Sequence, residues 1–359
     1  MPDSRAMRCG SGARLLFLLG LSPACGSESA PSGTELKLPD AGLVDAIADS
    51  TVDSGKDATE TGVPFDGPAS LSETGLFADM QSRTLAPGVL DYDVRYPLWS
   101  DGAEKQRFVS VPSGAQVDTS AIDLWQFPIG TKAWKEFRVA GKLIETRFLW
   151  KRAQGVDGWL KVAYLWNAAG TDAYPVPEGA PDAAGTKHDV PSLEQCEQCH
   201  NGAGDVLIGV SAIQLSKEAG GGQLAAFVAE GWLSQPPPAD FPVPGDGVVE
   251  DAIGYLHGNC GHCHNNESFL AEKRALRLKL LTSAKTPEET PLYQTALGAP
   301  AFHDLYGTQI IVTPGAPLTS QLLQRMTVRN LDQMPPLGTE VVDDAAVATV
   351  SQWITGLPP

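Results

Sequence analysis

The chain has 359 residues, a hydrophobic fraction of 42% and a formal net charge of −17 at pH 7. The length allows two modest domains and a tail, and the apolar content is enough for buried cores. So acidic a chain offers no positive surface for phosphate groups, which excludes nucleic acid as an expected partner. The cysteines do not follow the pattern of a disulfide framework, because four of the six form two C-x-x-C pairs, each followed by histidine.

Residues 1–25 resemble an export signal with features of the lipoprotein type. Three arginines precede the apolar run 15–21, which is too short to span a bilayer. A small residue before the isolated Cys25 resembles a bacterial lipoprotein cleavage site. We therefore expect the mature chain in the periplasm or cell envelope. Membrane attachment through a lipidated Cys25 and ordinary cleavage nearby both stay open.

Residues 26–72 are predicted to form a disordered acidic tether. This stretch is dominated by Ser, Thr, Asp, Gly, Ala and Pro and has hardly any aromatic residues. Such a composition cannot bury enough apolar surface to offset the entropy lost on folding. Ordered sequence is expected to begin near Thr74.

A β-rich domain is predicted over 76–190. Runs of aromatic and branched residues at 132–139, 143–152 and 159–167 are separated by turn residues, which predicts an antiparallel meander. Six of the eight tryptophans lie in this domain. We interpret them as the core of the sheet instead of a docking or sugar-binding surface, because large aromatic side chains dominate core energetics.

Helical signals follow in two further parts. The range 191–245 contains the first C-x-x-C-H motif and an apolar helix pattern that three prolines end. The range 247–357 shows helical spacing at both ends, before Cys260 and before Gly356. Small Ala252 and large Leu256 are expected to let these two terminal helices cross closely.

The two C-x-x-C-H motifs carry the chemistry of the sequence. Cysteines three residues apart lie about one helical turn apart, so both thiols can reach the vinyl groups of one haem while the histidine turns toward the iron. Redox-active or structural disulfides give no reason for a histidine after both pairs, whereas a shared zinc site is possible in ligand count. The sequence therefore predicts two covalently bound haem c groups, attached through Cys196, Cys199, Cys260 and Cys263, with His200 and His264 as the proximal iron ligands.

Met334 is predicted to be the sixth iron ligand of the second haem. It lies in the segment 332–336, whose two prolines can hold a thioether over the iron without hydrogen bonds. Met326 continues a helical apolar pattern, and we interpret it as a core residue.

The sixth ligand of the first haem stays open. His188, Met80 and His303 are all candidates, and five-coordinate iron is an alternative. His262 lies between the cysteines of its own motif and is not expected to reach that iron. His257 is expected to be exposed instead of ligating.

These motifs resemble known families. The range 247–357 resembles a class I cytochrome c domain in its paired terminal helices, its motif at the end of the first helix and its Met-Pro before the last. The range 90–357 resembles a bacterial family of two-haem c-type cytochromes that is largely uncharacterised. The stretches that carry this resemblance are Tyr92-Asp93-Val94-Arg95-Tyr96-Pro97-Leu98-Trp99-Ser100-Asp101, Phe127-Pro128-Ile129-Gly130-Thr131, Ile144-Glu145-Thr146-Arg147, Asn259-Cys260-Gly261-His262-Cys263-His264 and Met334-Pro335-Pro336-Leu337-Gly338.

The resulting expectation is an α+β fold, with an antiparallel β-rich N-terminal domain followed by mainly α-helical cytochrome c haem domains. The resemblance implies electron transfer and supplies no substrate. The partner expected is a redox protein, an extracytoplasmic dehydrogenase or another cytochrome, with a basic docking face.

An enzyme is the alternative hypothesis. In a two-haem peroxidase, the class I-like haem would supply electrons, and the other, lacking a sixth protein ligand, would bind peroxide. No catalytic residue is predicted from the sequence. A non-redox lipoprotein is a third hypothesis, and it leaves both haem motifs without a role.

Overall fold

The computed structural model describes residues 65–202, 204–216 and 222–358. These residues all belong to one unit, Glu60–Pro359. The predicted export signal, Cys25 and most of the predicted tether lie outside the described residues. The predicted boundaries between 76–190, 191–245 and 247–357 stay predictions.

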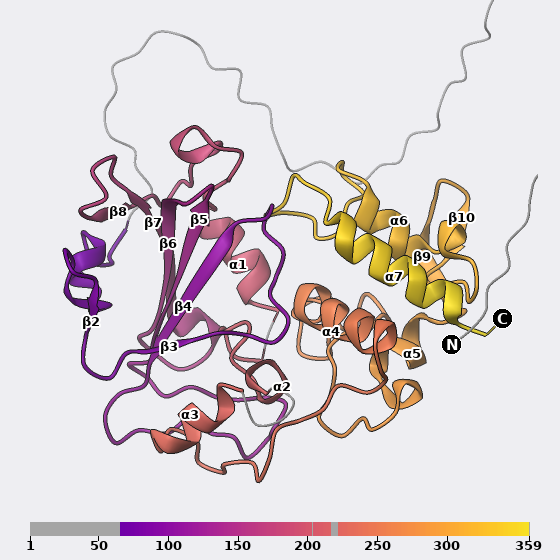
Figure 1. The fold of residues 1–359 in the computed structure, drawn as a ribbon, viewed down its shortest axis with the longest axis horizontal. Coiled ribbons are helices and arrows are strands. Elements are labelled where there is room, and N and C mark those ends of the chain that lie inside the picture. The colour runs from indigo at the N-terminus through magenta and orange to yellow at the C-terminus, as the bar shows by residue number, and fades with distance from the viewer. Residues whose placement is uncertain (1–64, 203, 217–221, 359) are drawn as a thin grey trace, which may run out of the picture. The chain divides into compact units, whose positions relative to one another are not determined.

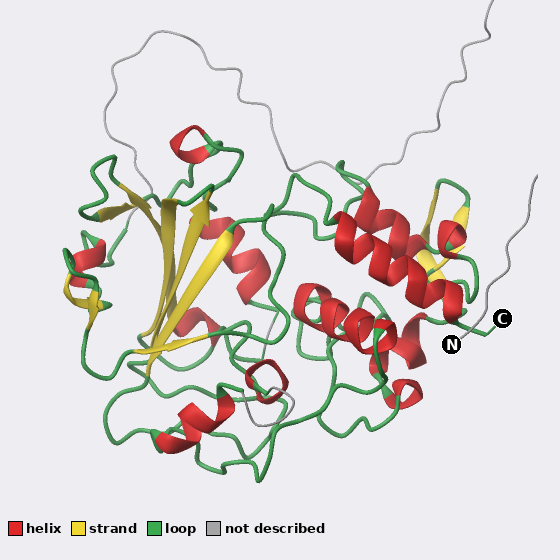
Figure 2. Cartoon of the chain, in the orientation of Figure 1, coloured by secondary structure: helices red, strands yellow, loops and turns green. Residues whose placement is uncertain are grey.

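A six-stranded antiparallel sheet dominates the first half of the described chain, and its strands follow one another in chain order (Figures 1 and 2). The three runs predicted as a meander form β5, β6 and β7, so the meander is confirmed. The sheet comprises β3 (Leu90–Tyr92), β4 (Glu104–Ser110), β5 (Lys132–Val139), β6 (Lys142–Lys151), β7 (Trp159–Trp166) and β8 (Ala173–Pro175).

Side chains alternate between the two faces of this sheet. One face carries an aromatic cluster in which Trp134 and Phe148 stack with ring centroids 5.5 Å apart. The opposite face carries Lys135 and Arg147, which are directly paired across β5 and β6. Four of the six tryptophans of this part are buried, in agreement with a core role: Trp125, Trp134, Trp159 and Trp166.

The segment that precedes the sheet belongs to the folded core. Leu71 has no exposed surface and packs in the aromatic cluster, and Phe65 is partly buried against it. The Tyr164 hydroxyl donates a hydrogen bond of 2.8 Å to the Pro68 carbonyl. The tether prediction is therefore wrong for residues 65–72, because these few apolar side chains find a partner surface that composition alone does not reveal.

Outside the large sheet, the described chain combines short helices with two small sheets and long irregular segments. The two-stranded sheets are β1 (Phe77–Asp79) with β2 (Thr84–Leu85), which precedes the large sheet, and β9 (Pro300–Leu305) with β10 (Thr308–Ile310). The helices are α1 (Leu193–His200), α2 (Ala212–Leu215), α3 (Leu224–Ala229), α4 (Val248–Cys260), α5 (Pro291–Ala296), α6 (Gln321–Thr327) and α7 (Asp344–Gly356). No helix in the described ranges has the length and apolar character that crossing a bilayer needs.

Helices α4 and α7 pack against each other, as expected from their apolar spacing. Ala252 and Leu256 of α4 share one buried cluster with Val350 and Trp353 of α7. The Trp353 indole donates a hydrogen bond of 2.9 Å to the Tyr293 hydroxyl, which satisfies its buried N–H.

The predicted fold class is nevertheless wrong. The described chain is dominated by the six-stranded antiparallel sheet, and mainly α-helical cytochrome c domains are not seen in the described residues of 191–202, 204–216 and 222–358. The longest helices there, α4 and α7, have 13 residues each. In the chain segment between α4 and α7, a side chain bonds to backbone carbonyls in a loop. The Arg277 guanidinium donates to the carbonyls of Ala271, Arg274 and Leu276. Amphipathic periodicity locates short helices but does not exclude such side-chain-supported loops.

Candidate functional site

The first C-x-x-C-H motif lies on α1. Ser192 caps the helix with a capping box: its hydroxyl accepts from the Gln195 N–H, and the Gln195 side chain accepts from the Ser192 N–H. Cys196 and Cys199 are free thiols one turn apart. The helix therefore presents both sulfur atoms on one face, with His200 as its last residue.

His200 is oriented by the backbone that follows it. Its Nδ1 lies 2.8 Å from the Val206 carbonyl. A carbonyl can only accept, so Nδ1 carries the proton and Nε2 is left available for a metal. Burial lowers the pKa of His200 to about 3, although the hydrogen bond to the Val206 carbonyl acts in the opposite direction. The ring is therefore neutral.

The buried carboxylate of Asp205 fixes the position of Val206. Its Oδ1 accepts from the Val206 N–H at 2.9 Å and from the Trp159 indole at 2.7 Å. Its Oδ2 accepts from the Phe127 N–H at 2.8 Å and from the Lys151 ammonium at 2.7 Å. Four donors thus hold one carboxylate between the sheet and the loop that orients His200.

A second ion pair ties the first motif itself to the sheet. Glu197, between the two cysteines, accepts from the Lys161 ammonium of β7 at 2.7 Å. The Lys161 side chain is only 2% exposed. The position of α1 on the sheet is therefore set by a charged contact from within the motif.

The second motif begins at the end of α4. Cys260 is the last helical residue, and its carbonyl accepts from the Cys263 and His264 N–H groups at 3.1 and 2.9 Å. The Nδ1 of His264 is buried and has no hydrogen-bond partner. Burial lowers the pKa of His264 to about 4, and the nearby Leu276 carbonyl opposes this shift without reaching bonding geometry. This ring is also neutral and so able to coordinate.

The two motifs meet at Gly202 and Asn265. A Cβ at Gly202 would lie 2.5 Å from the His262 carbonyl oxygen, so only glycine allows this approach. The buried Asn265 amide donates to the carbonyls of Gly202, Gly261 and His262 at 2.7, 2.9 and 2.9 Å. One side chain thus joins the backbone after the first motif to the backbone of the second.

Truncation of Asn265 tests this junction. Asn265→Ala is expected to lower the free energy of unfolding by about 1–3 kcal/mol, because three carbonyls lose a buried donor. The matched control is Asn266→Ala at the neighbouring exposed position, which loses one exposed hydrogen bond from Arg277 and should cost about 0.5–1 kcal/mol. Urea unfolding of both variants measures the difference, and equal midpoints would contradict the role of Asn265.

The segment around Trp99 connects the second motif with the loop that contains Met334. The Trp99 N–H donates to the Asn259 side chain at 2.7 Å, and its indole donates to the Val341 carbonyl at 2.9 Å. Asp101 accepts from the Thr339 hydroxyl at 2.7 Å. Three stretches that are far apart in the sequence therefore lie together here.

Met334 and Met326 differ in their surroundings. Met334 is half-buried in an irregular loop, and its N–H donates to the Arg325 carbonyl at 2.8 Å. The positive charge of Arg325 contributes to the lowered pKa of His264. Because Met334 bonds to the Arg325 backbone, the loop that contains Met334 is connected to the surroundings of the second motif. Met326 is 7% exposed within the α4–α7 cluster, in agreement with its interpretation as core.

The other candidate ligands lie apart from one another. The His188 Nε2 lies 2.7 Å from Glu145, which also binds Arg147, on the sheet face turned to the first motif. Met80 packs against the aromatic cluster on the opposite face, and His303 is exposed on β9. None of the three is thereby established as a sixth ligand.

The expectation that His257 is exposed is wrong. The ring is half-buried, and its Nδ1 accepts from the Leu280 N–H at 3.0 Å. Helical position alone did not reveal that the chain after the second motif returns over this turn of α4.

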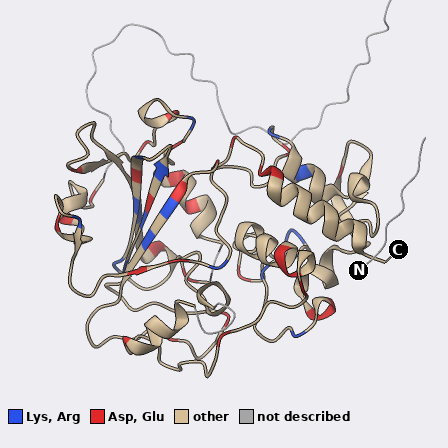
Figure 3. Cartoon of the chain, in the orientation of Figure 1, with Lys and Arg blue, Asp and Glu red and all other residues tan. Residues whose placement is uncertain are grey.

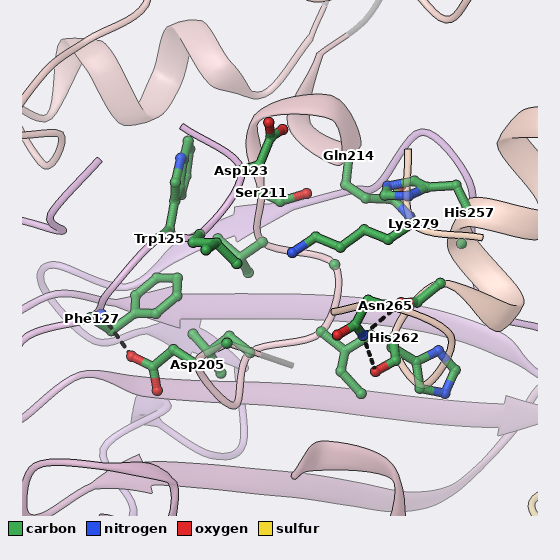
Figure 4. A pocket seen from close by; sticks show the side chains of 18 residues that line it. Asp123, Trp125, Phe127, Asp205, Ser211, Gln214, His257, His262, Asn265 and Lys279 are labelled. Carbon is green, nitrogen blue, oxygen red and sulfur yellow. Dashed lines mark hydrogen bonds between the residues drawn. The ribbon is translucent and has the colours of Figure 1, made fainter. Parts of the chain in front are cut away.

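A hollow lies beside the junction of the two motifs (Figure 4). It encloses about 620 Å³, part of which is open solvent, and is lined by residues 123–127, by 204–211 and by the second motif. His262 lines it with a buried Nδ1 that has no partner, and the Lys279 side chain extends into it. Both residues between the second pair of cysteines, Gly261 and His262, therefore line this hollow.

The donor set fits covalent haem attachment at each motif. Two thiols one turn apart precede a neutral histidine in both copies, and the His200 ring has one nitrogen free. Sequence reasoning found these six residues and missed Asp205 and Asn265. Asn265 directly follows His264, but an isolated Asp or Asn in a sequence gives no sign that it is buried.

Comparisons with family models, with curated proteins and with solved structures found no match. The functional argument therefore depends on the residues of this chain alone.

Proposed function

We propose that the protein is an extracytoplasmic electron carrier with two covalently attached haems. Cys196, Cys199 and His200 would hold one haem, and Cys260, Cys263 and His264 the other. This proposal depends on the attachment motifs and on the contacts between them, and does not require a helical cytochrome c fold.

The observation that carries the proposal is the junction of the two motifs. Gly202 approaches the His262 carbonyl, and Asn265 bonds to backbone on both sides. Two redox groups attached to adjacent backbone could exchange electrons within one chain. Bound haem supplies iron that alternates between the ferrous and ferric states, with a potential set by its ligands and its burial.

The residues of the chain have defined roles in this proposal. The Val206 carbonyl orients the His200 ring, and Asp205 holds that carbonyl in place. Met334 is proposed as the distal ligand of the second haem. The partner is proposed to be a redox protein with a basic docking face, such as an extracytoplasmic dehydrogenase or another cytochrome, and lipidation of Cys25 would attach the carrier to a membrane.

Haem counting tests the function directly. The full chain, produced with a cytochrome c maturation system, is expected to gain two haem masses in intact-protein mass spectrometry and to show a reduced α-band. The variant Cys260→Ala/Cys263→Ala should gain only one haem mass. Chains without covalent haem would refute the proposal, and a high-spin ferric spectrum with rapid peroxide turnover would favour the enzyme over the carrier.

A further inference from the structure

The sheet face turned toward α1 carries six cations. Arg107, Lys135 and Arg147 lie directly opposite one another on three neighbouring strands. Figure 3 marks lysines and arginines in blue along these strands, with acidic residues in red among them. Like charges placed directly opposite on neighbouring strands destabilise a sheet. The complete set is Lys105 and Arg107 on β4, Lys135 on β5, Arg147 and Lys151 on β6, and Lys161 on β7.

Four of these cations have a carboxylate partner. The pairs are Arg107 with Asp93 at 2.9 Å, Arg147 with Glu145 at 2.7 Å, Lys151 with Asp205 at 2.7 Å and Lys161 with Glu197 at 2.7 Å. Among the described residues, no carboxylate pairs with Lys105 or Lys135. Lys105 donates to the Leu98 carbonyl at 2.7 Å, and the Lys135 ammonium lies 5.1 Å from the centroid of the Phe137 ring. The face therefore holds two lysines without a carboxylate partner.

These two lysines are also half-buried. Burial lowers the pKa of Lys135 well below its usual value, and the neighbouring guanidinium groups add to this shift. The same causes lower the pKa of Lys105 to about 8. Keeping an unpaired cation away from water costs free energy. A face built in this way is suited to an anionic ligand.

This cationic face lies next to the first motif. Helix α1 packs on β7, and Glu197 within the motif accepts from Lys161 of this face at 2.7 Å. The electrostatic effect of Lys135 and Arg147 on the pKa of Cys199 agrees with this placement. A haem attached at this motif brings two propionate carboxylates. The number of these carboxylates equals the number of unpaired lysines.

We propose that Lys105 and Lys135, with Arg107 and Arg147 beside them, form a binding site for two carboxylates, namely the propionates of the haem attached at Cys196 and Cys199. This inference depends on the proposed function. A free dicarboxylate has the same chemistry and is the alternative source.

The test compares two double variants of the haem-loaded full chain. Lys105→Gln/Lys135→Gln removes both unpaired cations. Lys132→Gln/Lys285→Gln removes the same charge from a lysine on the opposite face of β5 and from an exposed lysine outside the sheet, which donate to the carbonyls of Thr74 and Thr282. Resonance Raman spectra report the propionate bending mode, spectroelectrochemical titration gives both midpoint potentials, and succinate serves as the free dicarboxylate.

Lys105→Gln/Lys135→Gln is expected to shift the propionate band of one haem and to lower one midpoint potential, because lost positive charge favours ferric iron. The control should change neither by a comparable amount, and succinate should not bind to the wild type. If the double variant does not fold, Lys135→Gln alone should change the propionate band and the midpoint potential in the same directions, but by smaller amounts.

Three other outcomes overturn the assignment. Unchanged Raman bands and potentials, with two haems still bound, refute the site while leaving the proposed function intact. Saturable binding of succinate to the wild type, lost in Lys105→Gln/Lys135→Gln, shows that the site takes a free dicarboxylate. Absence of covalent haem in the wild type refutes the proposed function itself and the propionate assignment with it.

Discussion

Replacing Asp205 by Ala is expected to lower the free energy of unfolding by about 3–5 kcal/mol, the usual cost of removing one partner of a buried ion pair. Asp205 and Lys151 are each only 2% exposed at their side chains, so the ammonium would be left without a counter-charge. The Trp159 indole and the Phe127 N–H would lose an acceptor as well. Urea unfolding followed by far-UV circular dichroism measures the loss.

Asp66→Ala is the matched control for this variant. Asp66 also pairs with a cation, Arg152, at 3.0 Å, but its side chain is 79% exposed. Exposed ion pairs contribute only about 0–1 kcal/mol. If Asp205→Ala cost no more than Asp66→Ala, the buried pair would not exist in solution. Loosening of Val206 should also broaden the spectrum of the first haem, since its carbonyl orients His200.

Replacing Met334 by Ala is expected to lower the midpoint potential of the second haem. A thioether favours ferrous iron, and axial ligands change haem potentials over a range of ~0.8 V, so a shift on the order of tenths of a volt follows. The variant should also bind carbon monoxide and lose any sulfur-to-iron charge-transfer band. Potentiometric titration and visible spectra of the haem-loaded chain measure these changes.

Met326→Ala separates ligation from packing. Met326 lies in the α4–α7 core, where truncation costs ~2–5 kcal/mol while ligation is kept. Met334 is only half-buried, so its removal should destabilise less and change the haem more. If Met326→Ala abolished the charge-transfer band and Met334→Ala retained it, the two roles would have to be exchanged.

Local patterns in the sequence predicted the elements that depend on local physics. The runs that form β5, β6 and β7 were recognised because branched and aromatic residues alternate between turn signals. The amphipathic spacing of α4 and α7 likewise predicted that these helices pair. The excess of expected helix came from the resemblance to cytochrome c domains and not from this spacing, and the loop that Arg277 supports is one place where the chain departs from it.

The candidate site shows the same difference between residues that a local pattern marks and residues that only tertiary contacts reveal. The proposed attachment residues were predicted from their spacing, since a C-x-x-C-H motif contains its chemistry within five consecutive residues. The residues that position them were not found. Asp205 binds Lys151 and Trp159 over sequence separations of 54 and 46 residues, and no local pattern marks such a contact.

The sequence by itself determined which atoms could attach and coordinate a redox group: four thiols and two imidazoles at fixed short spacings. Only the tertiary structure decided where these atoms lie relative to one another and to the charged side chains around them. Asn265 joins two motifs whose histidines are 64 positions apart, and the pairing of β4, β5 and β6 places Arg107, Lys135 and Arg147 side by side. Burial and charge compensation depend on neighbours brought together from distant positions, and a linear sequence does not encode these neighbours as a local pattern.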